Sequence, residues 1–299
     1  MRWKADALKA KYNSRKQLSL GVVVPCHNNS RQLYGVLSAL MYQSTRPETV
    51  LVVDDNSNPV EGQKLRWLCK NLAASYLKLP PPRSELESLG RRSHARNAGT
   101  KCLNTDLVLY LDGDMLLGPR YVEEIKYYHA ALQGIYIRGQ RYCIPDTAQA
   151  RGMNVCLSEV AKRRLPSAAV SPDYVVQSTN FGWKKACSEA YYDKWEWCAS
   201  NNLSVRNEDV SRIGYWDENF VGWGEEDMDF SFRLHKSGLT PILLISDNAV
   251  SYHLEHHIDH KTNASTLKAN GRYLLRKFPE VAENRRDAYA RYGISIEDL

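Results

Sequence analysis

Short apolar runs alternate with helix-forming stretches throughout the first half of the chain. Apolar runs occupy residues 18–24 (LSLGVVV), 49–53 (TVLVV), 76–79 and 107–111 (LVLYL), and helical patterns occupy residues 30–42, 65–72 and 93–103. Strands that are covered on both faces are continuously apolar, and helices between them return the chain to start a parallel neighbour. The alternation therefore predicts an α/β fold with a mostly parallel central sheet and helices on both of its faces.

The second half is less regular. Residues 139–201 show no clear period, so we expect loops and short helices that cover a cleft. Two further strands are predicted at 242–245 (ILLI) and 249–253 (AVSYH), and a helical tail at 262–292. With 299 residues, 43% of them hydrophobic, the chain can bury a sizeable core. We expect a helical N-terminal extension (1–17), one main domain (18–260) and a C-terminal helical tail (261–299).

Composition narrows the class of protein. No run of about 18 apolar residues predicts a transmembrane helix, and the basic N-terminus lacks the apolar stretch of a signal peptide. Seven cysteines without a CxxC pair indicate reduced thiols, so we expect a cytoplasmic protein. A net charge of +6 without dense basic clusters fits an anionic small molecule or weak contact with a membrane surface, and argues against nucleic acid. The oligomeric state is left open.

Polar and acidic residues follow the predicted strands, where ligands of such sheets collect. Asp54 and Asp55 follow the second strand, and Asp112, Gly113 and Asp114 follow the fourth. Residues i and i+2 of an extended segment point to the same side, so the last pair converges, and glycine between them allows close approach of a ligand. Paired carboxylates repel unless a cation lies beside them, although both pairs are also common in turns.

Two late segments also carry candidate chemistry. Four acids lie within five residues from Glu225 to Asp229, next to Trp223. They suit the first turn of a helix that ends at Gly238, and they equally suit a catalytic carboxylate. The segment SYHLEHHIDH holds four histidines in eight residues from His253 to His260. A zinc site there is an alternative, weakened by the lack of nearby cysteines. No GxGxxG follows the first strand, which disfavours ordinary dinucleotide binding.

Six pieces in this order carry a family resemblance: VVVPCHNN, VVDDNS, HARNAGT, LYLDGDM, NNLSVR with FVGWGEEDMDFSFRLHKSG, and SYHLEHH. Together they resemble an inverting glycosyltransferase of the GT-A fold, most similar to family 2. The WGEED region is similar to the WGGED segment of chondroitin-polymerase and galactosyltransferase-type catalytic domains. The resemblance runs from about residue 18 to 257. It implies a GT-A fold, a Rossmann-like and mostly parallel sheet, with residues 18–260 as the catalytic domain.

The resemblance also implies a nucleotide-sugar site. Asp112, Asp114 and His253 would hold Mn²⁺ (or Mg²⁺) against the diphosphate of a UDP-sugar, where a Lewis acid neutralises the charge of the leaving group. Further donor contacts would come from the following residues: Pro25 and His27 at the base and ribose, Asp54 or Asp55 at the uracil N3, Arg96 and Asn97 at the diphosphate, and Asp112 with Gly113. A helix start near Arg96 also favours an anion.

The acidic segment takes the acceptor role in this resemblance. Asp227 would be the general base and Glu226 would orient the acceptor, with Trp223, Gly224 and Asn202 binding it. This chain departs from the family by Glu225, which stands where the second glycine of WGGED is usual, and by PCHNN where PTYN is usual.

The function implied is metal-dependent, inverting transfer of a hexose or N-acetylhexosamine to a hydroxyl of a glycan, peptide or small molecule. A catalytically silent nucleotide-sugar or glycan-binding protein is the alternative. A sugar-nucleotide pyrophosphorylase is disfavoured, because no Gly-rich signature lies near the N-terminus.

Overall fold

A computed structural model describes residues 17–144, 195–244, 249–255 and 260–299. The strands of these residues form one nine-stranded sheet in the order β3-β2-β1-β4-β7-β6-β9-β5, with β8 paired to β6. The strands are β1 (Leu20–Cys26), β2 (Thr49–Asp54), β3 (Ser75–Lys78), β4 (Leu107–Leu111), β5 (Met115–Leu117), β6 (Ile135–Ile144), β7 (Asn202–Arg206), β8 (Thr240–Leu244) and β9 (Val250–Leu254).

Helices connect the strands and end the chain. They are α2 (Ser30–Met41), α3 (Pro59–Asn71), α4 (Arg92–Lys101), α5 (Tyr121–Ala131), α10 (Asn207–Arg212), α11 (Glu226–Lys236), α12 (His260–Lys277) and α13 (Ala282–Ala290). Each of the four strands and three helices predicted up to residue 111 overlaps an observed element of the same kind. The predicted N-terminal helix lies outside the described residues.

The sheet is mixed but mostly parallel, as predicted. Strands β3, β2, β1 and β4 pair in parallel, and so do β6 with β8 and β6 with β9. Strand β7 runs antiparallel between β4 and β6, and β5 runs antiparallel to β9. The sequence prediction missed β5, β6 and β7. Residues 139–144, expected in loops, belong to β6, and residues 145–194 lie outside the described part.

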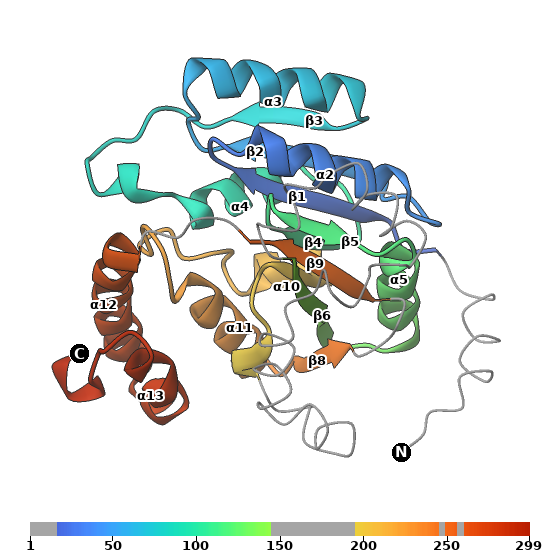
Figure 1. Ribbon diagram of the computed structural model, residues 1–299. Coiled ribbons are helices and arrows are strands. Elements are labelled where there is room, and N and C mark those ends of the chain that lie inside the picture. The colour runs from blue at the N-terminus through green and yellow to red at the C-terminus, as the bar shows by residue number, and fades with distance from the viewer. Residues whose placement is uncertain (1–16, 145–194, 245–248, 256–259) are drawn as a thin grey trace.

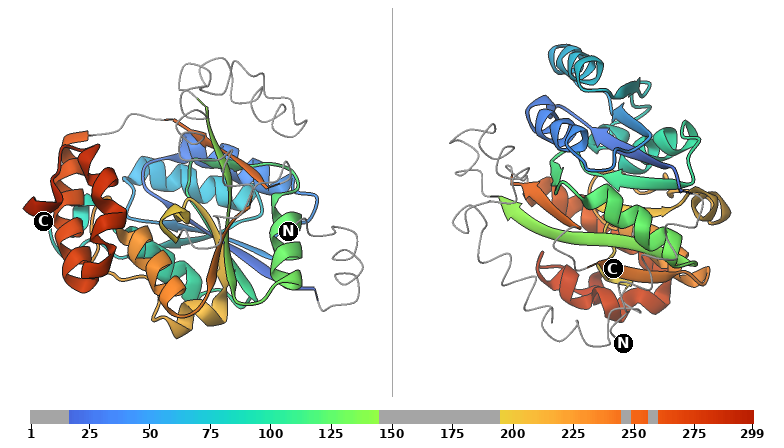
Figure 2. Two further views of the ribbon diagram at one scale, coloured as in Figure 1. Left: turned by 90° about the horizontal axis from the view of Figure 1, so that it is seen from below. Right: turned by 90° about the vertical axis from the view of Figure 1, so that its right-hand side faces the viewer.

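Alternate residues of the strands build two cores, one on each face of the sheet. Val22 and Val24 of β1 pack in a cluster with residues of α2, α3 and α5. Val23, on the opposite face, packs in a cluster with residues of α4, α10 and α11. Helices therefore cover both faces, as the continuous apolar strands indicated (Figures 1 and 2).

The C-terminal helices α12 and α13 lie together beside α11, at one end of the molecule (red in Figures 1 and 2). They pack through a third cluster that includes Phe220 and Met228 from the main part of the chain and Leu274 from α12. This places the helical tail next to the acidic segment at the start of α11. In the part of the chain that the structure describes, no helix is both long and apolar enough to cross a bilayer.

Candidate active site

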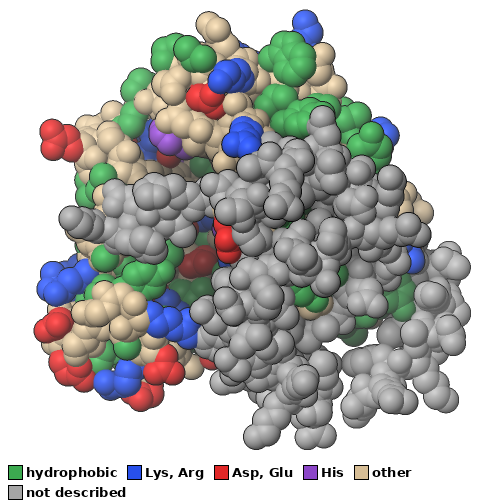
Figure 3. Space-filling model, in the orientation of Figure 1, with side chains coloured by type: hydrophobic (Ala, Val, Ile, Leu, Met, Phe, Trp, Pro, Cys, Tyr) green, Lys and Arg blue, Asp and Glu red, His purple; other side chains and the backbone are tan. Residues whose placement is uncertain are grey.

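A cleft of about 490 Å³ opens at the carboxyl ends of β1, β2 and β4. Its lining includes these residues predicted for the donor or the metal: Pro25, His27, Asp55, Arg96, Asp112, Gly113 and Asp114, together with Trp223. The parallel strands end side by side, and the polar residues that follow them therefore meet at one edge of the sheet. Figure 3 shows acidic side chains recessed near the middle of the face seen there.

Gly113 lets the DGD turn approach the first strand. A Cβ atom at this position would lie 2.4 Å from the Asn29 amide nitrogen and 3.1 Å from the Cys26 sulfur, so no larger residue fits without a shift. Asn29 Nδ2 donates to the Gly113 carbonyl at 3.3 Å. The turn is thus fixed against the end of β1, with Asp112 and Asp114 on either side of it.

The two acids at the end of β2 have different surroundings. The Asp54 side chain is fully buried and accepts hydrogen bonds from the Ser57 amide (2.8 Å) and the Tyr76 hydroxyl (2.5 Å). Asp55 lines the cleft, where its carboxylate accepts from the backbone amide and Nε of Arg91, at 2.7 and 2.8 Å. Of the two acids between which the sequence does not decide, Asp55 lines this cleft and Asp54 does not.

Asp114 and His253 lie side by side. The residues that flank them pair across β5 and β9, with Met115 opposite His253, and the Leu254 amide donates to the Asp114 carbonyl at 2.9 Å. Backbone pairing therefore brings His253 Nε2 to 3.4 Å from Asp114 Oδ2. A carboxylate beside an imidazole is a donor set that suits Mn²⁺, so these two residues fit a divalent cation.

Asp112 does not complete a three-residue cluster. Its Oδ1 lies 3.3 Å from Arg96 Nη2, and among the described residues no three His, Cys, Asp or Glu side chains gather closely enough to hold an ion. The structure thus brings together two of the three predicted ligands. His256 and His257, which the zinc alternative requires, lie outside the described residues.

Arg96 links the larger cleft to the acidic segment. Its side chain is 2% exposed, and its guanidinium reaches Asp112 Oδ1 at 3.3 Å and Glu226 Oε1 at 3.2 Å. The same group lies 4.6 Å from the ring centroid of Trp216. It lines the cleft as predicted, but it is a buried bridge between two carboxylates rather than a freely exposed cation.

Asp227 faces a second pocket of about 160 Å³, which adjoins the first because Trp223 lines both. Its carboxylate accepts a hydrogen bond from the Met228 amide at 3.0 Å, at the start of α11. Burial raises the pKa of Asp227 to about 7, helped by the charges of Glu226 and Glu225 and opposed by Arg96 and Arg285. A carboxyl group with such a pKa exchanges protons near neutral pH.

Glu225 occupies an unusual position before α11. Its φ is 70°, a left-handed conformation that disfavours side-chain-bearing residues, and its side chain is buried. Its two carboxylate oxygens accept from Arg285 of α13 at 2.7 and 3.1 Å. Burial raises the pKa of Glu225, and the Arg285 charge opposes this rise. The family's usual glycine is thus replaced by an acid that is tied to the C-terminal tail.

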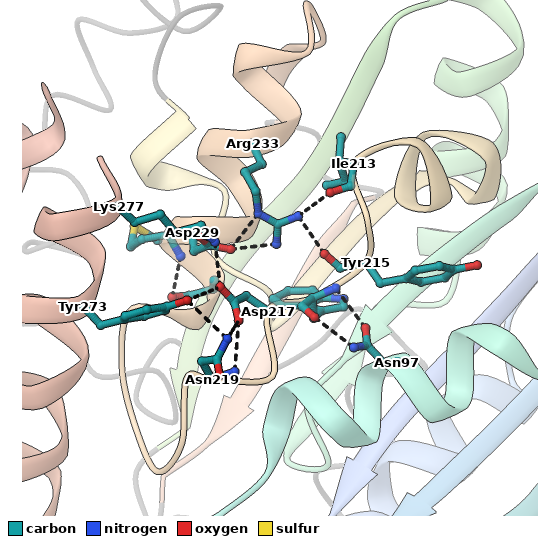
Figure 4. A network of polar contacts seen from close by, with 12 residues as sticks. Asn97, Ile213, Tyr215, Asp217, Asn219, Asp229, Arg233, Tyr273 and Lys277 are labelled. Carbon is teal, nitrogen blue, oxygen red and sulfur yellow. Dashed lines mark hydrogen bonds and ion pairs between the residues drawn. The ribbon is translucent and has the colours of Figure 1, made fainter. Parts of the chain in front are cut away.

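A polar network holds the loop that precedes the acidic segment (Figure 4). Lys277 of α12 contacts Asp217 Oδ2 at 2.7 Å and Asp229 Oδ1 at 2.5 Å. Arg233 binds Asp229 and also the carbonyl oxygens of Ile213 and Tyr215, at 2.9 and 2.7 Å. These contacts tie the loop to helices α11 and α12.

Two predicted contacts are corrected by the structure. Asn97 is buried and faces the loop instead of the donor: its Nδ2 donates to the Trp216 carbonyl at 2.9 Å, and its Oδ1 accepts from the Trp216 amide at 2.9 Å. Asn202 is fully buried inside the sheet, where its Nδ2 donates to the Gly139 carbonyl and the Ser251 hydroxyl. Neither side chain lines either of the two pockets.

Sequence reasoning missed Arg91, Arg285 and Tyr292. Arg91 holds Asp55, and its place beside Arg92 in the run RRSHARN was a signal that basic residues gather near the cleft. Arg285 and Tyr292 line the second pocket from the C-terminal tail. No motif marks them, and Arg285 lies 60 residues beyond Glu225, which it contacts.

Comparisons with known proteins agree with this architecture. Residues 21–153 match the model of Glycosyl transferase family 2, and residues 184–257 match that of the N-terminal domain of galactosyltransferase. Validoxylamine A glucosyltransferase of Streptomyces hygroscopicus subsp. limoneus is 28% identical over 270 residues, which cover 88% of this chain and 57% of that protein. Chondroitin synthase of Escherichia coli is 24% identical, over 81% of this chain and 36% of that protein.

The chain spans about three fifths or less of the length of these curated relatives. Among solved structures, GalNAc-T7 with UDP, GalNAc and Mn²⁺ has a TM-score of 0.60 at 11% identity, covering 88% of this chain and 48% of that one. This likeness concerns the fold alone. The solved structures thus show a GT-A fold, and the family models and the named relatives support a glycosyltransferase whose residues 21–153 are similar to glycosyltransferase family 2.

Proposed function

We propose that the protein transfers a hexose or N-acetylhexosamine from a UDP-sugar to an acceptor hydroxyl, with inversion at the anomeric carbon. The observation that carries this proposal is the pair of adjoining pockets. One is lined by Asp114, whose carboxylate lies 3.4 Å from His253 Nε2, the other is lined by Asp227, and Trp223 borders both. The reacting sugar would lie where the two pockets meet.

The donor would occupy the larger pocket. Pro25 and His27 would line the base and ribose, and Asp55 would accept a hydrogen bond from the uracil N3. Asp114 and His253 would hold Mn²⁺ (or Mg²⁺), with Asp112 reaching the donor through water or the ribose. When bound there, the cation supplies Lewis-acid neutralisation of the charge on the leaving diphosphate. Arg96, which lines the same pocket, adds a fixed positive charge near that group.

The acceptor would enter through the smaller pocket. Asp227 would take the proton from the attacking hydroxyl, and its pKa of about 7 suits a general base at neutral pH. Inversion requires the base to lie on the face of the sugar opposite the leaving group, which the separate pocket allows. Glu226 would orient the acceptor while it holds Arg96. Gly224 leaves the wall beside Trp223 without a side chain.

The relatives support the substrate class without fixing it. One is named for glucose transfer, and a structural neighbour contains UDP, GalNAc and Mn²⁺. The acceptor is proposed only as a hydroxyl on a glycan, peptide or small molecule.

A donor screen tests the proposal. UDP-glucose, UDP-galactose and their N-acetylated counterparts are incubated with Mn²⁺, and released UDP is measured with and without candidate acceptors. UDP release from at least one donor is expected, and the product should have the opposite anomeric configuration. Binding of UDP-sugars without any turnover would instead favour a silent binding protein, and selective binding of GDP or dTDP would contradict the uridine assignment.

A further inference from the structure

The smaller pocket has two walls from different parts of the chain. One wall comes from the segment that contains Trp223 and Asp227, and the other from Leu267 of α12, Arg285 of α13 and Tyr292 just after it. The tail packs tightly on this turn, since a Cβ atom at Gly224 would lie 2.8 Å from the Leu267 Cδ1. The C-terminal helices are therefore part of the pocket itself.

The ion pair between Arg285 and Glu225 ties these two walls together. Glu225 keeps a left-handed backbone, its side chain is 0% exposed, and Arg285 holds both of its carboxylate oxygens. A buried carboxylate in that backbone conformation is stable only when it is paired. The pair therefore sets the distance between the C-terminal tail and Asp227, which lies two residues after Glu225.

The charges of the pocket select against anions. It is lined by the carboxylates of Glu225, Glu226 and Asp227. Arg285, which also lines it, is paired with Glu225, and Arg96, which lines the larger cleft, is paired with Glu226 and Asp112. Among the described lining residues, no further Lys or Arg faces the pocket. A carboxylate or phosphate on the acceptor would meet like charge, whereas a hydroxyl can donate to Asp227.

Two aromatic rings that contact each other form one wall of the pocket, against which one face of a sugar ring can pack. Trp223 and Tyr292 both line the pocket, with centroids 5.3 Å apart and planes inclined at 52°. At about 160 Å³, the pocket is well below the usual 300 Å³ or more of whole small-molecule sites, so it takes one end group of an acceptor.

We propose that the C-terminal helices complete the acceptor subsite: it binds the neutral, hydroxylated terminal ring of the acceptor against Trp223 and Tyr292, and the Arg285–Glu225 ion pair positions its wall. This rests on the proposed transfer function and names the class of acceptor for it. Arg285 is a positioning residue that acts through Glu225, and Tyr292 determines acceptor specificity.

Ligand binding by the full chain tests the proposal with two probes that differ by one group, methyl glucoside and methyl glucuronide. Saturation-transfer NMR in the presence of UDP and Mn²⁺ gives their dissociation constants. The glucoside should bind, and the glucuronide should bind at least about tenfold more weakly because of its carboxylate. Equal or tighter binding of the glucuronide, or no binding of the glucoside, would overturn the proposal.

Two variants separate positioning from general stability. Tyr292→Ala should weaken glucoside binding about tenfold and leave UDP affinity within about twofold, while Tyr42→Ala, an exposed tyrosine at the end of α2, should change neither. Arg285→Met should weaken the glucoside in the same selective way. If Arg285→Met fails to fold, the double variant Glu225→Gly with Arg285→Met is used, because it removes both the unpaired acid and the strained backbone. The double variant should fold with unchanged UDP affinity, and its glucoside binding should be partly restored.

Unchanged glucoside binding in Tyr292→Ala, or equal loss of UDP and glucoside affinity in the folded Arg285 variants, would refute the assignment. Release of UDP from UDP-sugars by the unmodified protein is measured in parallel. If that release is absent while the probes behave as expected, the transfer function fails and the binding subsite stands.

Discussion

The site contains two acidic clusters that the protein treats differently. The side chains of Asp112 and Asp114, after β4, are 38% and 18% exposed and open to the larger cleft. The side chains of Glu225 and Glu226, before and at the start of α11, are 0% and 9% exposed, and each is held by an arginine. Arg96 joins the clusters, since it contacts one member of each. The first cluster is accessible to a cation from solution, whereas the charges of Glu225 and Glu226 are neutralised by arginines of the chain itself.

One acid in the second cluster differs from its neighbours in its pairing. Glu225 has Arg285, Glu226 has Arg96, and Asp229 has Arg233 with Lys277. In the described residues Asp227 forms no ion pair, and its pKa is the one raised to about 7. Paired acids serve structure, and the unpaired one is free to exchange a proton. This distinction can be tested by substituting the paired and the unpaired acids or their partners.

The largest effect is expected for Asp227→Asn. If Asp227 is the general base, transfer should fall about a hundredfold to ten-thousandfold, while UDP affinity is unchanged. Steady-state transfer and calorimetry with UDP measure the two quantities. Asp287→Asn, an exposed acid on the neighbouring α13, is the matched control and should behave as the unmodified protein. Near-native transfer by Asp227→Asn, or retention of configuration, would rule out this role.

Loss of the external cation should come next. EDTA should stop turnover and Mn²⁺ should restore it, and Asp114→Ala should lower transfer on the order of a hundredfold through loss of Lewis-acid stabilisation. Mn²⁺ affinity, followed by electron paramagnetic resonance, should fall in parallel. Full activity in EDTA, or an Asp114→Ala protein with normal Mn²⁺ affinity, contradicts the assignment.

The pH dependence gives a prediction with a defined sign. A base must be ionised, so transfer should fall about tenfold per unit as the pH drops below the Asp227 pKa of about 7. Stability should change in the opposite direction. Because the folded pKa lies above the ordinary value of 3.8, the folded state binds the proton more tightly, and this group lowers the free energy of unfolding as pH rises from about 4 to about 7.

Comparing urea unfolding of the unmodified protein with that of Asp227→Asn isolates this contribution, since the amide does not titrate. The difference between the two should depend on pH in that window. If the two proteins show parallel pH profiles of stability, Asp227 titrates in the ordinary acidic range.

The smallest effect concerns an acid that is paired for structure. Lys277→Met removes one partner of buried Asp229, which keeps Arg233, so the free energy of unfolding should fall by about 1 to 3 kcal/mol. Transfer at low temperature should stay near native. Lys236→Met, which breaks an ion pair with both side chains about half exposed, should cost less than about 1 kcal/mol. Urea unfolding measures the free energy of unfolding of both variants. Equal decreases in the two would show that burial of Asp229 does not strengthen its ion pair.

Sequence patterns predicted the parts of the fold that are apolar and local. Strands β1, β2 and β4 are buried on both faces, so every residue contributes to the pattern. Strand β7 was missed because it contains Asn202 and Ser204, polar residues that are buried and hydrogen-bonded within the sheet. Strand β5 has only three residues, too few to show a period.

The candidate site was predictable where a motif lay at a strand end and less so elsewhere. The neighbouring positions of Asp114 and His253 agree with the resemblance to the family. The uses of Asn97 and Asn202 were misjudged, because a motif shows which residues occur together and not which way each side chain faces. The pairing of Arg285 with Glu225 depends on how α13 packs, and no local pattern encodes a contact between helices so far apart in sequence.

The pairing of β5 with β9 also bears on the order of folding. Asp114 lies in the first half of the chain and His253 near its end, and only the ladder between these two strands brings them together. A chain that has been synthesised only as far as α11 contains the DGD turn but not its histidine. Because such distant contacts close late, acquisition of the histidine beside Asp114 would report completion of the sheet rather than its beginning.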